Sequence, residues 1–513
     1  MKNWKDFFKG KRVTLMGLGL LGRGLGDAIF LAEQGAELIV TDLHDEKTLG
    51  PSLAKLKKYK NIEYVLGKHR LEDFRNRDFI VKAAGVHLDS PYILEAQKNG
   101  IPIEMDASLF AKLMPKGVTL VGVTGTRGKS TVTALIYEIL SAATRDTLHA
   151  TRSVYKGGNL VPEATLPLLE KVKSGDIVVL ELDSWQLQGF HDAKISPQVA
   201  VFTTFLDDHL IYYKNDRKQY FADKTAIFRY QKAGDVLIAG EEVMKLLSAR
   251  SDLKSGKRSD LERRGFVVTK KEDVPENWNI PLLGEHNLEN IACAVAVAKH
   301  LKIPEKTIQE VVENFKPVPG RLEFLREVRG VKIYNDNNAT TPDATLAALR
   351  ALARNPKSQA PRLRRSGFGG QANSKQISKS QNLQISKLDK HIVLICGGTD
   401  KGLDMSKLVE AIPKYCKAVV LLKETGTEKL LVTYNAKRVT SDKESKALHA
   451  TCYMLQNAPA YELDTLHDCA DMALRLAKRG DTVLFSPAFA SFGKWFKNEY
   501  DRGNQFVELT QRL

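Results

Sequence analysis

A glycine-rich segment directly after an apolar run is the feature of this sequence that most constrains its fold. Residues 122–131 read Gly-Val-Thr-Gly-Thr-Arg-Gly-Lys-Ser-Thr, and the run 118–123 that leads into them is apolar and strand-like. The run 132–140 that follows has helical character. Strand, glycine turn and helix in this order are typical of a phosphate-binding loop, in which backbone N–H groups face phosphate oxygens. The sequence therefore predicts a parallel α/β domain that binds a nucleoside triphosphate.

The residue types in this loop suit distinct roles. Two glycines let the backbone turn tightly, a lysine reaches the β- and γ-phosphates, and a serine can bind Mg²⁺. The longer form of the motif has glycine at position 123, where this chain has valine, so the shorter Gly-x-x-Gly-Lys-Ser form is predicted. A glycine turn followed by a chance Lys-Ser pair is the alternative. The predicted ATP contacts in the loop are Gly125, Thr126, Gly128, Lys129, Ser130 and Thr131.

Length and composition indicate an ordinary globular protein of about three domains, at roughly 150 residues per domain. The chain has 513 residues, of which 43% are hydrophobic and 27% charged. Its apolar runs are shorter than the ~20 residues that span a bilayer, and the first eleven residues do not resemble a signal peptide. Five cysteines without Cys-x-x-Cys spacing favour reduced thiols over a zinc site. We expect a cytoplasmic, monomeric protein without membrane insertion.

Half of the formal net charge of +16 lies in one stretch, residues 354–390. It contains nine Lys or Arg residues against one acid, among many Ser, Gln, Asn and Gly. Because such a composition cannot bury a core, we interpret the stretch as a disordered surface insertion. A nucleic-acid-binding tail is the alternative, but almost no aromatic residues are present to stack on bases, and no nucleic-acid partner is expected. Deleting the stretch should leave enzymatic activity within a few-fold.

A second glycine motif opens the chain. A predicted strand at 12–16 leads into Gly-Leu-Gly-Leu-Leu-Gly at 17–22, then into a helical run and a second strand that ends in Asp42. This is the dinucleotide-binding fingerprint, and taken alone it predicts NAD or FAD. A nicotinamide-dependent dehydrogenase is therefore one hypothesis for the chain. It leaves the loop at 122–131 unexplained.

Strands and helices alternate along the whole chain, which predicts an α/β protein. We predict a Rossmann-like N-terminal domain (1–105), a central phosphate-loop ATPase domain with a parallel sheet (106–317) and a Rossmann-like C-terminal domain (318–513). In the central domain, the predicted strands 177–182 and 199–205 each lead into acidic residues. Beside a phosphate loop, acids at the carboxyl edge of a parallel sheet indicate metal ligands.

Taken in order, these motifs resemble those of the Mur ligase family of ATP-dependent amide-forming enzymes. The resemblance covers nearly the whole chain, apart from 354–390 and the region 144–156. Within the family, it is strongest to the members that join D-glutamate to UDP-N-acetylmuramoyl-L-alanine. Beyond the phosphate loop it rests on Glu-Leu-Asp-Ser-Trp-Gln-Leu at 181–187, Asp-His-Leu at 208–210, Gly-Glu-His-Asn at 284–287, Asn-Asp-Asn-Asn-Ala-Thr-Thr-Pro at 335–342, Gly-Gly-Thr-Asp-Lys-Gly at 397–402 and Phe-Lys-Asn-Glu-Tyr-Asp-Arg-Gly at 496–503.

The resemblance implies a nucleotide-sugar domain, an ATPase domain and an amino-acid-binding domain that closes when ligands bind. It reassigns the first glycine turn to the diphosphate of a UDP substrate, which a helix N-terminus holds for the same physical reason. The implied reaction has two steps: ATP phosphorylates the carboxylate of UDP-N-acetylmuramoyl-L-alanine, and the amine of D-glutamate then displaces phosphate. Metal ions and a lysine are needed to neutralise the approaching anions. The product would be a peptidoglycan precursor.

The implied catalytic and metal residues lie in the central segment. Lys129 would hold the γ-phosphate, Ser130 and Glu181 would bind one Mg²⁺, and His209 would bind a second. Lys224, fifteen residues after His209, would be carbamylated and would help to position the second metal. From the residues alone, His209 could equally be a strand-end histidine with satisfied hydrogen bonds, and Lys224 a surface cation on a helix.

The resemblance also implies substrate contacts. Asn287 could instead be a helix N-cap, and Thr340 and Ser491 could be turn residues. The implied adenine and ribose contacts are Asn287, Asn290, Arg321 and Asp336. The implied D-glutamate contacts are Thr340, Lys401, Ser491 and Tyr500. The implied contacts of the nucleotide sugar are Gly17, Gly19, Leu20, Leu21, Asp42, Gly85 and Asn159.

The chain also departs from the family pattern. Asp183 stands where a second serine is common, Ile211 replaces an acid, and the loop at 491–496 is one residue longer. One rival reading is another Mur-type ligase that adds a different amino acid or uses folate or a cell-wall lipid. Another is a non-catalytic nucleotide-binding protein that holds nucleic acid through its basic stretch. Lys401 in its Asp-Lys-Gly setting favours the D-glutamate reading.

Overall fold

The computed structural model describes residues 4–145, 152–160, 162–209, 211–249, 265–353, 390–440, 446–491 and 495–512. The insertion predicted at 354–390 lies outside these residues except for Lys390. The chain forms two compact units, which we call the first and second units. The first unit comprises Met1–Trp278 and Asn287–Phe315, and the second comprises Asn279–His286 and Lys316–Leu513.

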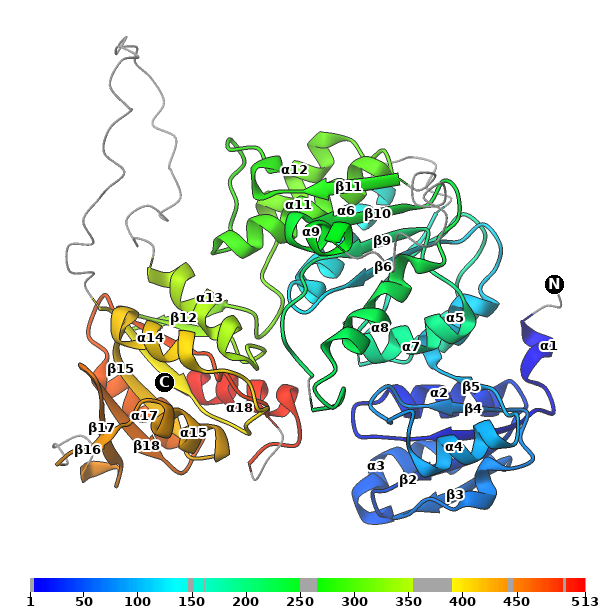
Figure 1. Cartoon of the computed structure of the whole chain (residues 1–513), viewed down its shortest axis with the longest axis horizontal. Coiled ribbons are helices and arrows are strands. Elements are labelled where there is room, and N and C mark those ends of the chain that lie inside the picture. The colour runs from blue at the N-terminus through cyan, green and yellow to red at the C-terminus, as the bar shows by residue number, and fades with distance from the viewer. Residues whose placement is uncertain are drawn as a thin grey trace, which may run out of the picture. The chain divides into compact units, whose positions relative to one another are not determined.

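The first unit opens with a five-stranded parallel sheet in the order β3-β2-β1-β4-β5 (Figure 1). The strands that follow β1 are added first on one side of it, as β2 and β3, and then on the other side, as β4 and β5. The glycine turn after β1 therefore lies at a topological switch point, where α/β sheets bind ligands. The strands are β1 (Arg12–Met16), β2 (Glu37–Asp42), β3 (Ile62–Leu66), β4 (Phe79–Lys82) and β5 (Ile103–Glu104), and the helices are α1 (Lys5–Phe8), α2 (Arg23–Glu33), α3 (Glu46–Leu56) and α4 (Pro91–Lys98).

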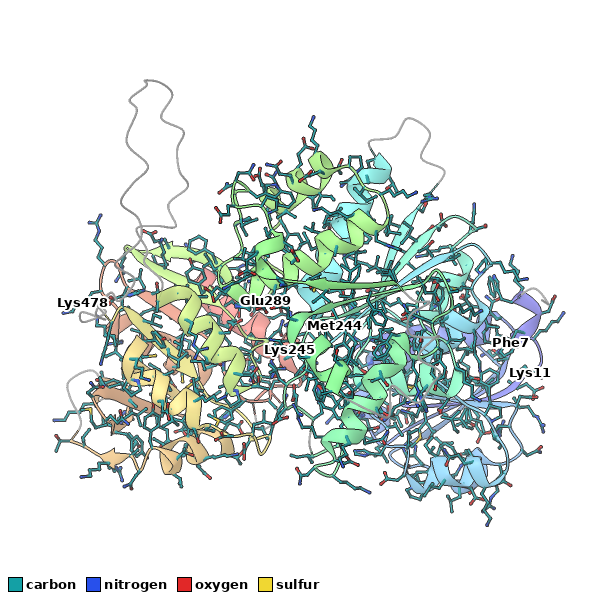
Figure 2. All side chains as sticks on the ribbon, turned by 45° about the horizontal axis from the view of Figure 1, so that its top comes forward. Phe7, Lys11, Met244, Lys245, Glu289 and Lys478 are labelled. Carbon is teal, nitrogen blue, oxygen red and sulfur yellow. The ribbon has the colours of Figure 1, made fainter. Side chains whose placement is uncertain are left out.

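Aromatic packing attaches the short helix α1 to this sheet. The ring of Phe7, labelled in Figure 2, lies 5.7 Å from the ring of Phe79 in β4. The ring of Phe8 lies 5.3 Å from that of Phe30 in α2 and is fully buried. Burial of an aromatic side chain contributes about 1.5–3 kcal/mol, which is enough to hold a helix too short to be stable alone.

A second sheet in the first unit has six parallel strands in the order β11-β10-β9-β6-β8-β7. Its centre, β6, lies between β9 and β8, so the loops that follow these three strands leave from one edge. The strands are β6 (Thr119–Thr124), β7 (Val154–Gly158), β8 (Ile177–Glu181), β9 (Val199–Phe202), β10 (Val236–Gly240) and β11 (Gly265–Thr269). The helices are α5 (Asp106–Leu113), α6 (Lys129–Arg145), α7 (Ser184–Ala193), α8 (Arg217–Arg229), α9 (Glu241–Ala249), α11 (Glu285–His300) and α12 (Glu305–Asn314).

One hydrophobic cluster runs through both sheets of the first unit. It includes Leu31 of α2, Phe110 of α5 and Leu166, all of which are fully buried. The backbone of α2 closely approaches the segment that follows β7, because a Cβ added at Gly26 would lie 2.8 Å from the Cβ of Ala164. The two sheets therefore share one core.

The second unit holds a mixed eight-stranded sheet in the order β12-β13-β19-β14-β15-β18-β17-β16. Five central strands are parallel, and antiparallel strands extend both edges. Hydrophobic clusters cover both faces. The strands are β12 (Glu323–Val328), β13 (Val331–Asn335), β14 (Ile392–Cys396), β15 (Cys416–Leu422), β16 (Lys437–Arg438), β17 (Thr451–Leu455), β18 (Ala458–Leu463) and β19 (Thr482–Phe485). The helices are α13 (Pro342–Ala353), α14 (Ser406–Tyr415), α15 (Thr425–Thr433), α17 (Leu466–Leu476) and α18 (Glu499–Gln511).

The predicted α/β class, with parallel sheets in the N-terminal and central parts, is confirmed. The predicted strand at 199–205 is shorter, because β9 ends at Phe202 and the next residues bond to the phosphate loop. Among the residues that the structure describes, none of the helices is long and apolar enough to cross a membrane.

Candidate active site

The loop between β6 and α6 has the backbone shape that its glycines predict. Gly125 and Gly128 have φ angles of +149° and +84°, a region that side chains disfavour. A Cβ on Gly125 would collide with Oγ1 of Thr203, and one on Gly128 would collide with Oδ1 of Asn290. The helix α6 begins at Lys129, directly after the turn. The turn thus directs the N-terminal N–H groups of α6 towards the space where phosphate binds.

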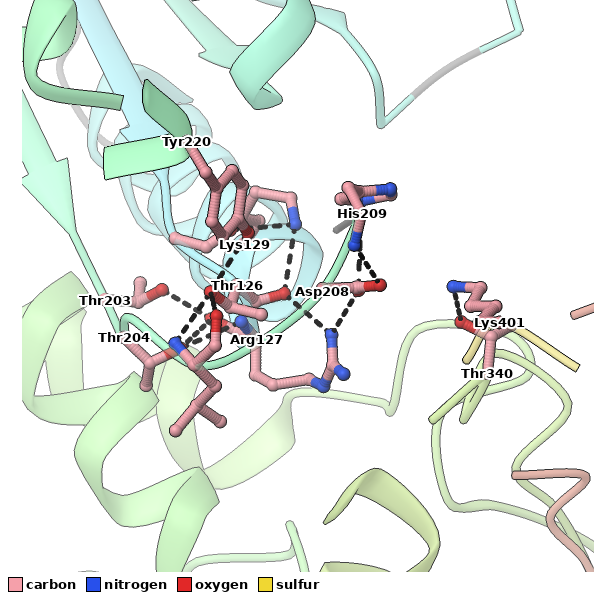
Figure 3. A network of polar contacts seen from close by, with 12 residues as sticks. Thr126, Arg127, Lys129, Thr203, Thr204, Asp208, His209, Tyr220, Thr340 and Lys401 are labelled. Atoms are coloured by element: carbon pink, nitrogen blue, oxygen red, sulfur yellow. Dashed lines mark hydrogen bonds and ion pairs between the residues drawn. The ribbon is translucent and has the colours of Figure 1, made fainter. Parts of the chain in front are cut away.

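The side chain of Lys129 folds back over this loop. Its ammonium donates to the carbonyl oxygens of Gly125, at 3.0 Å, and of Thr126, at 3.3 Å. The loop is itself tied to the segment after β9, since Thr126 N donates to Thr204 O at 2.8 Å (Figure 3). The lysine is therefore held at the loop, where phosphate oxygens could replace neutral carbonyl acceptors with charged ones.

Glu181 ends β8 beside the phosphate loop, because Val123 and Glu181 are paired in the parallel ladder. Its side chain is 1% exposed, and among the described residues its Oε2 atom has no hydrogen-bond partner. From the same described residues, its Oε1 atom accepts one long bond, 3.5 Å, from the amide of Asn159. A buried carboxylate oxygen without a donor is costly unless a cation binds it.

Lys224 on α8 is 2% exposed, so the alternative reading of this residue as a surface cation is wrong. Its ammonium donates to Gly125 O at 3.0 Å and to Thr124 Oγ1 at 3.4 Å. Burial, and next the positive charge of Lys129, lower the pKa of Lys224 well below its usual range. A lowered pKa increases the fraction of neutral amine, which is the form that reacts with CO2.

His209 lies well beyond the end of β9, so it is not a strand-end histidine. Its backbone is left-handed, with φ of +56°, and its N–H donates to Oδ1 of Asp208 at 2.9 Å. Its ring centroid lies 4.7 Å from that of Trp185, in an edge-to-face contact. Sequence reasoning did not assign roles to Trp185 or Asp208.

The first glycine turn is ordered by Asp42, at the end of β2. Oδ2 of Asp42 accepts from Gly19 N at 2.8 Å, and Oδ1 accepts from the backbone N and the ring Nδ1 of His44 at 2.8 and 2.7 Å. Burial opposes ionisation, but these donors lower the pKa of Asp42. Leu20 and Leu21 are 45% and 38% exposed beside the turn, an apolar surface available to a ligand.

Sequence reasoning missed two basic side chains that bond at or beside the predicted nucleotide-sugar contacts Gly85 and Asn159. Gly85 lies in the loop after β4, where Lys82 donates to the carbonyl of Val86 at 3.0 Å. Burial lowers the pKa of Lys82 to about 8. The carbonyl of Asn159 accepts from Arg23 at 3.1 Å, which connects the start of α2 to the end of β7.

The predicted ATP contacts fall in both units. Asn287 and Asn290 lie one turn apart on α11 and are joined by a 3.0 Å bond. Because Asn287 is the third residue of α11, it is not an N-cap. In the second unit Asp336 is 8% exposed and accepts from Leu322 N and Ser486 Oγ. Burial raises the pKa of Asp336 to about 7, although these bonds and the charge of Arg321 oppose the rise.

The predicted D-glutamate contacts all lie in the second unit. Lys401 donates to Thr340 Oγ1 at 3.1 Å, a pair drawn in Figure 3. Ser491 is 3% exposed and follows Ala490, which bridges to Thr399 near Lys401. The structure thus brings Thr340 and Lys401 together and holds the two loops that carry Lys401 and Ser491 side by side. Tyr500 is 42% exposed on α18.

Sequence reasoning assigned no role to Arg502 on α18, which ties the loop that carries Thr340 to the loop that carries Ser491. Its guanidinium is fully buried and donates to Asn337 Oδ1 at 2.7 Å and to Asn337 O at 2.9 Å. It also donates to the carbonyls of Phe489 and Ala490, both at 3.2 Å. Burial lowers the pKa of Arg502 to about 10. An arginine among polar helix residues gives no local signal that its side chain will be buried.

Known proteins match most of this chain. Residues 11–104 match the model of the Mur ligase MurD-like N-terminal domain, and residues 123–298 match that of the Mur ligase middle domain. The UDP-N-acetylmuramoylalanine–D-glutamate ligase of Roseiflexus sp. (strain RS-1) is 33% identical over 98% of this chain and 98% of its own length. The chain belongs to the Mur ligase family. The corresponding ligases of Borreliella burgdorferi (strain ATCC 35210) and Clostridioides difficile (strain 630) are each 30% identical, over 99% and 98% of this chain and 99% of their own lengths.

Solved structures of Mur ligases share the fold. The UDP-N-acetylmuramate–alanine ligase MurC of Thermotoga maritima aligns with a TM-score of 0.55 and 18% identity over 98% of this chain and 99% of its own. The MurF ligase of Thermotoga maritima, in complex with ADP, aligns with a TM-score of 0.51 and 18% identity over 99% of this chain and 97% of its own. Membership of the Mur ligase family favours the nucleotide-sugar interpretation of the first glycine turn over the dinucleotide one.

Mur ligases are ATP-dependent, and the residues of this chain suit the Mg²⁺ that accompanies ATP. The buried Oε2 of Glu181, which has no hydrogen-bond partner in the described part of the chain, and the hydroxyl of Ser130 are hard oxygen donors of the kind that Mg²⁺ prefers. Among the described residues no group of three or more His, Cys, Asp or Glu side chains forms a metal site. The predicted set contains only two residues of these types, Glu181 and His209, so the fit rests on the unpartnered carboxylate oxygen.

Proposed function

We propose that this Mur ligase joins D-glutamate to UDP-N-acetylmuramoyl-L-alanine at the expense of ATP, producing a peptidoglycan precursor. The observation that carries the proposal is similarity over nearly the full length to relatives named as D-glutamate ligases, at 30–33% identity. We also propose that the protein acts in the cytoplasm as a monomer.

In the first step a carboxylate oxygen of the muramoyl substrate attacks the γ-phosphorus of ATP. The bond from that phosphorus to the β,γ-bridging oxygen breaks, ADP leaves, and an acyl phosphate forms. Lys129 and the N–H groups at the start of α6 would hold the transferred phosphoryl group and offset its charge. Mg²⁺ bound by Ser130 and Glu181, and a second Mg²⁺ bound by His209 and carbamylated Lys224, would neutralise the remaining charge.

In the second step the neutral amine of D-glutamate attacks the acyl carbon, and the C–O bond to phosphate breaks. The amine loses a proton and an amide remains. Lys401 would pair with a carboxylate of the amino acid, while Thr340 and Ser491 would supply hydroxyl hydrogen bonds, and Tyr500 would border the amino acid. The observed Lys401–Thr340 bond supports this assignment, because it fixes the lysine beside a hydroxyl.

The environment of Lys224 supports its carbamylation. A cationic lysine is expensive at a site that is 2% exposed and already near Lys129. Carbamylation forms a bond from the neutral amine nitrogen to the carbon of CO2 and releases one proton. The product is an anion, so the repulsion from Lys129 becomes attraction, and the new oxygens suit a metal ion.

Phosphate release from ATP by the purified chain tests the proposed function. We expect release only with Mg²⁺, UDP-N-acetylmuramoyl-L-alanine and D-glutamate, and not with L-alanine, L-lysine or L-glutamate. The variant Lys129→Ala should be inactive while folded. Release that depends on another amino acid would instead favour a different Mur-type ligase.

A further inference from the structure

Arg127 is the one charged side chain of the phosphate loop that the proposed mechanism does not use. Its guanidinium Nη1 lies 3.0 Å from Oδ2 of Asp208 and 3.1 Å from the carbonyl of Thr126 (Figure 3). The side chains of this ion pair are 24% and 5% exposed for Arg127 and Asp208. A pair this well covered is screened less by water than a surface pair, so its geometry is better defined.

The backbone already fastens the first part of the segment after β9 to the phosphate loop. Arg127 N donates to Thr204 Oγ1 at 2.8 Å, and Leu206 N donates to Thr126 Oγ1 at 2.9 Å. Beyond Leu206, the ion pair with Arg127 also joins Asp208, the residue before His209, to the phosphate loop.

Asp208 in turn fixes His209. While Oδ2 of Asp208 bonds to Arg127, its Oδ1 accepts the N–H of His209 at 2.9 Å. Oδ2 also lies 3.8 Å from Nε2 of the His209 ring. The left-handed backbone of His209, at φ of +56°, is strained for a residue with a side chain and persists only when its surroundings enforce it. The aspartate supplies that restraint, and the arginine holds the aspartate.

We propose that Arg127 and Asp208 are positioning residues that hold His209 at a fixed place relative to the phosphate loop, so that its ring can bind a metal ion there. The inference rests on the proposed role of His209 as a metal ligand. Residues that orient a ligand typically contribute 10–100-fold to metal affinity or activity. Because Arg127 acts through Asp208, loss of either residue should have the same effect.

The test is equilibrium binding of Mn²⁺ to the full chain, measured from the electron paramagnetic resonance of free Mn²⁺, with and without saturating ADP. Variants are Arg127→Gln, Arg127→Lys, Asp208→Asn, the double variant Arg127→Gln/Asp208→Asn, and His209→Ala. The matched control is Arg217→Gln, which removes the neighbouring but exposed ion pair of Arg217 with Asp207, 2.6 Å long with side chains 50% and 58% exposed. Circular dichroism and melting temperature establish that each variant is folded.

We expect Arg127→Gln and Asp208→Asn each to weaken Mn²⁺ binding by 10-fold or more, and the double variant to be no weaker than either. Arg127→Lys should bind Mn²⁺ at intermediate strength, and Arg217→Gln should stay within two-fold of the wild type. In activity assays of Arg127→Gln and Asp208→Asn, the Mg²⁺ concentration that gives half-maximal activity should rise by a larger factor than the KM for ATP.

Three results would overturn the inference. Should Arg127→Gln raise the KM for ATP while Asp208→Asn leaves Mn²⁺ binding unchanged, the arginine contacts the nucleotide directly and does not act through Asp208. Should His209→Ala retain wild-type Mn²⁺ binding, both the metal-ligand role of His209 and the positioning role fail. Weaker Mn²⁺ binding by His209→Ala, together with unchanged Mn²⁺ binding by Arg127→Gln, would refute the positioning role alone.

Discussion

Replacing Asp336 by asparagine should stabilise the protein at pH 8 and change its stability little near pH 4. The carboxyl group is 8% exposed, and burial raises its pKa to about 7 from an ordinary value of 3.8. Between these two values the folded state keeps a proton that the unfolded state has lost. The stabilisation from this group is therefore fully present below pH ~4 and is lost as the pH rises through ~7.

The size of the effect follows from the shift. About three pKa units at 1.36 kcal/mol each correspond to about 4 kcal/mol of free energy of unfolding. Asparagine is neutral at every pH and can still accept from Leu322 N, whose bond to Asp336 is 2.9 Å. Its amide can donate to Ser486 Oγ, because that hydroxyl also has Thr345 Oγ1 as a partner at 2.9 Å. The substitution therefore removes the charge and keeps the bonding pattern.

The assay is denaturant unfolding of the wild type and Asp336→Asn from pH 4 to 8.5, without nucleotide. The difference in free energy of unfolding should grow from near zero to about 4 kcal/mol across this range. The control Asp464→Asn alters a carboxylate that is 73% exposed and should show no such trend. A difference that does not depend on pH would refute the reasoning, since it would mean that Asp336 ionises normally in the folded protein.

Three further predictions test other parts of the structure. Gly128→Ala should reduce ATP-dependent phosphate release at least 100-fold while the protein stays folded, because the new methyl group collides with Asn290; retention of activity would contradict the loop geometry. Asp27→Asn should raise the free energy of unfolding, and with it the melting temperature, at pH 8, because burial and then Asp106 raise the pKa of Asp27 and so its stabilisation is lost at high pH; an equal or lower melting temperature would exclude this. Removal of dissolved CO2 should lower wild-type activity and bicarbonate should restore it, whereas Lys224→Met should be inactive in both conditions.

Much of the site could be predicted because its signals are local in the sequence. Glycines at fixed spacing, an apolar strand before them and acids at strand ends locate the phosphate loop and Glu181 without any knowledge of tertiary structure. Alternation of apolar strands and helices likewise predicted the class of fold. The antiparallel hairpin of β17 and β18 was not predicted, because its two-residue connection, Gln456 and Asn457, contains no glycine.

The remaining features depend on pairs that are distant in sequence. Arg502 and Asn337 are 165 residues apart, and Arg127 and Asp208 are 81 apart. Local periodicity does not reveal that either arginine is covered, because arginine is usually exposed and only its partner makes burial tolerable. The low exposure of Lys224 could not be predicted for the same reason, because the carbonyl of Gly125 that accepts its hydrogen bond lies in a segment distant in sequence.

The bonding of Asp42 bears on how glycine fingerprints are read in other proteins. In a dinucleotide site the acid after the second strand is expected to bind a ribose hydroxyl, yet here both of its oxygens accept N–H groups of its own chain, from Gly19 and His44. The acid therefore maintains the shape of the turn through bonds within its own chain. A fingerprint of this kind identifies a backbone that receives a diphosphate, and the organic groups attached to that diphosphate must be inferred from side chains elsewhere. One turn can consequently serve cofactors in some enzymes and sugar nucleotides in others without alteration of its own residues.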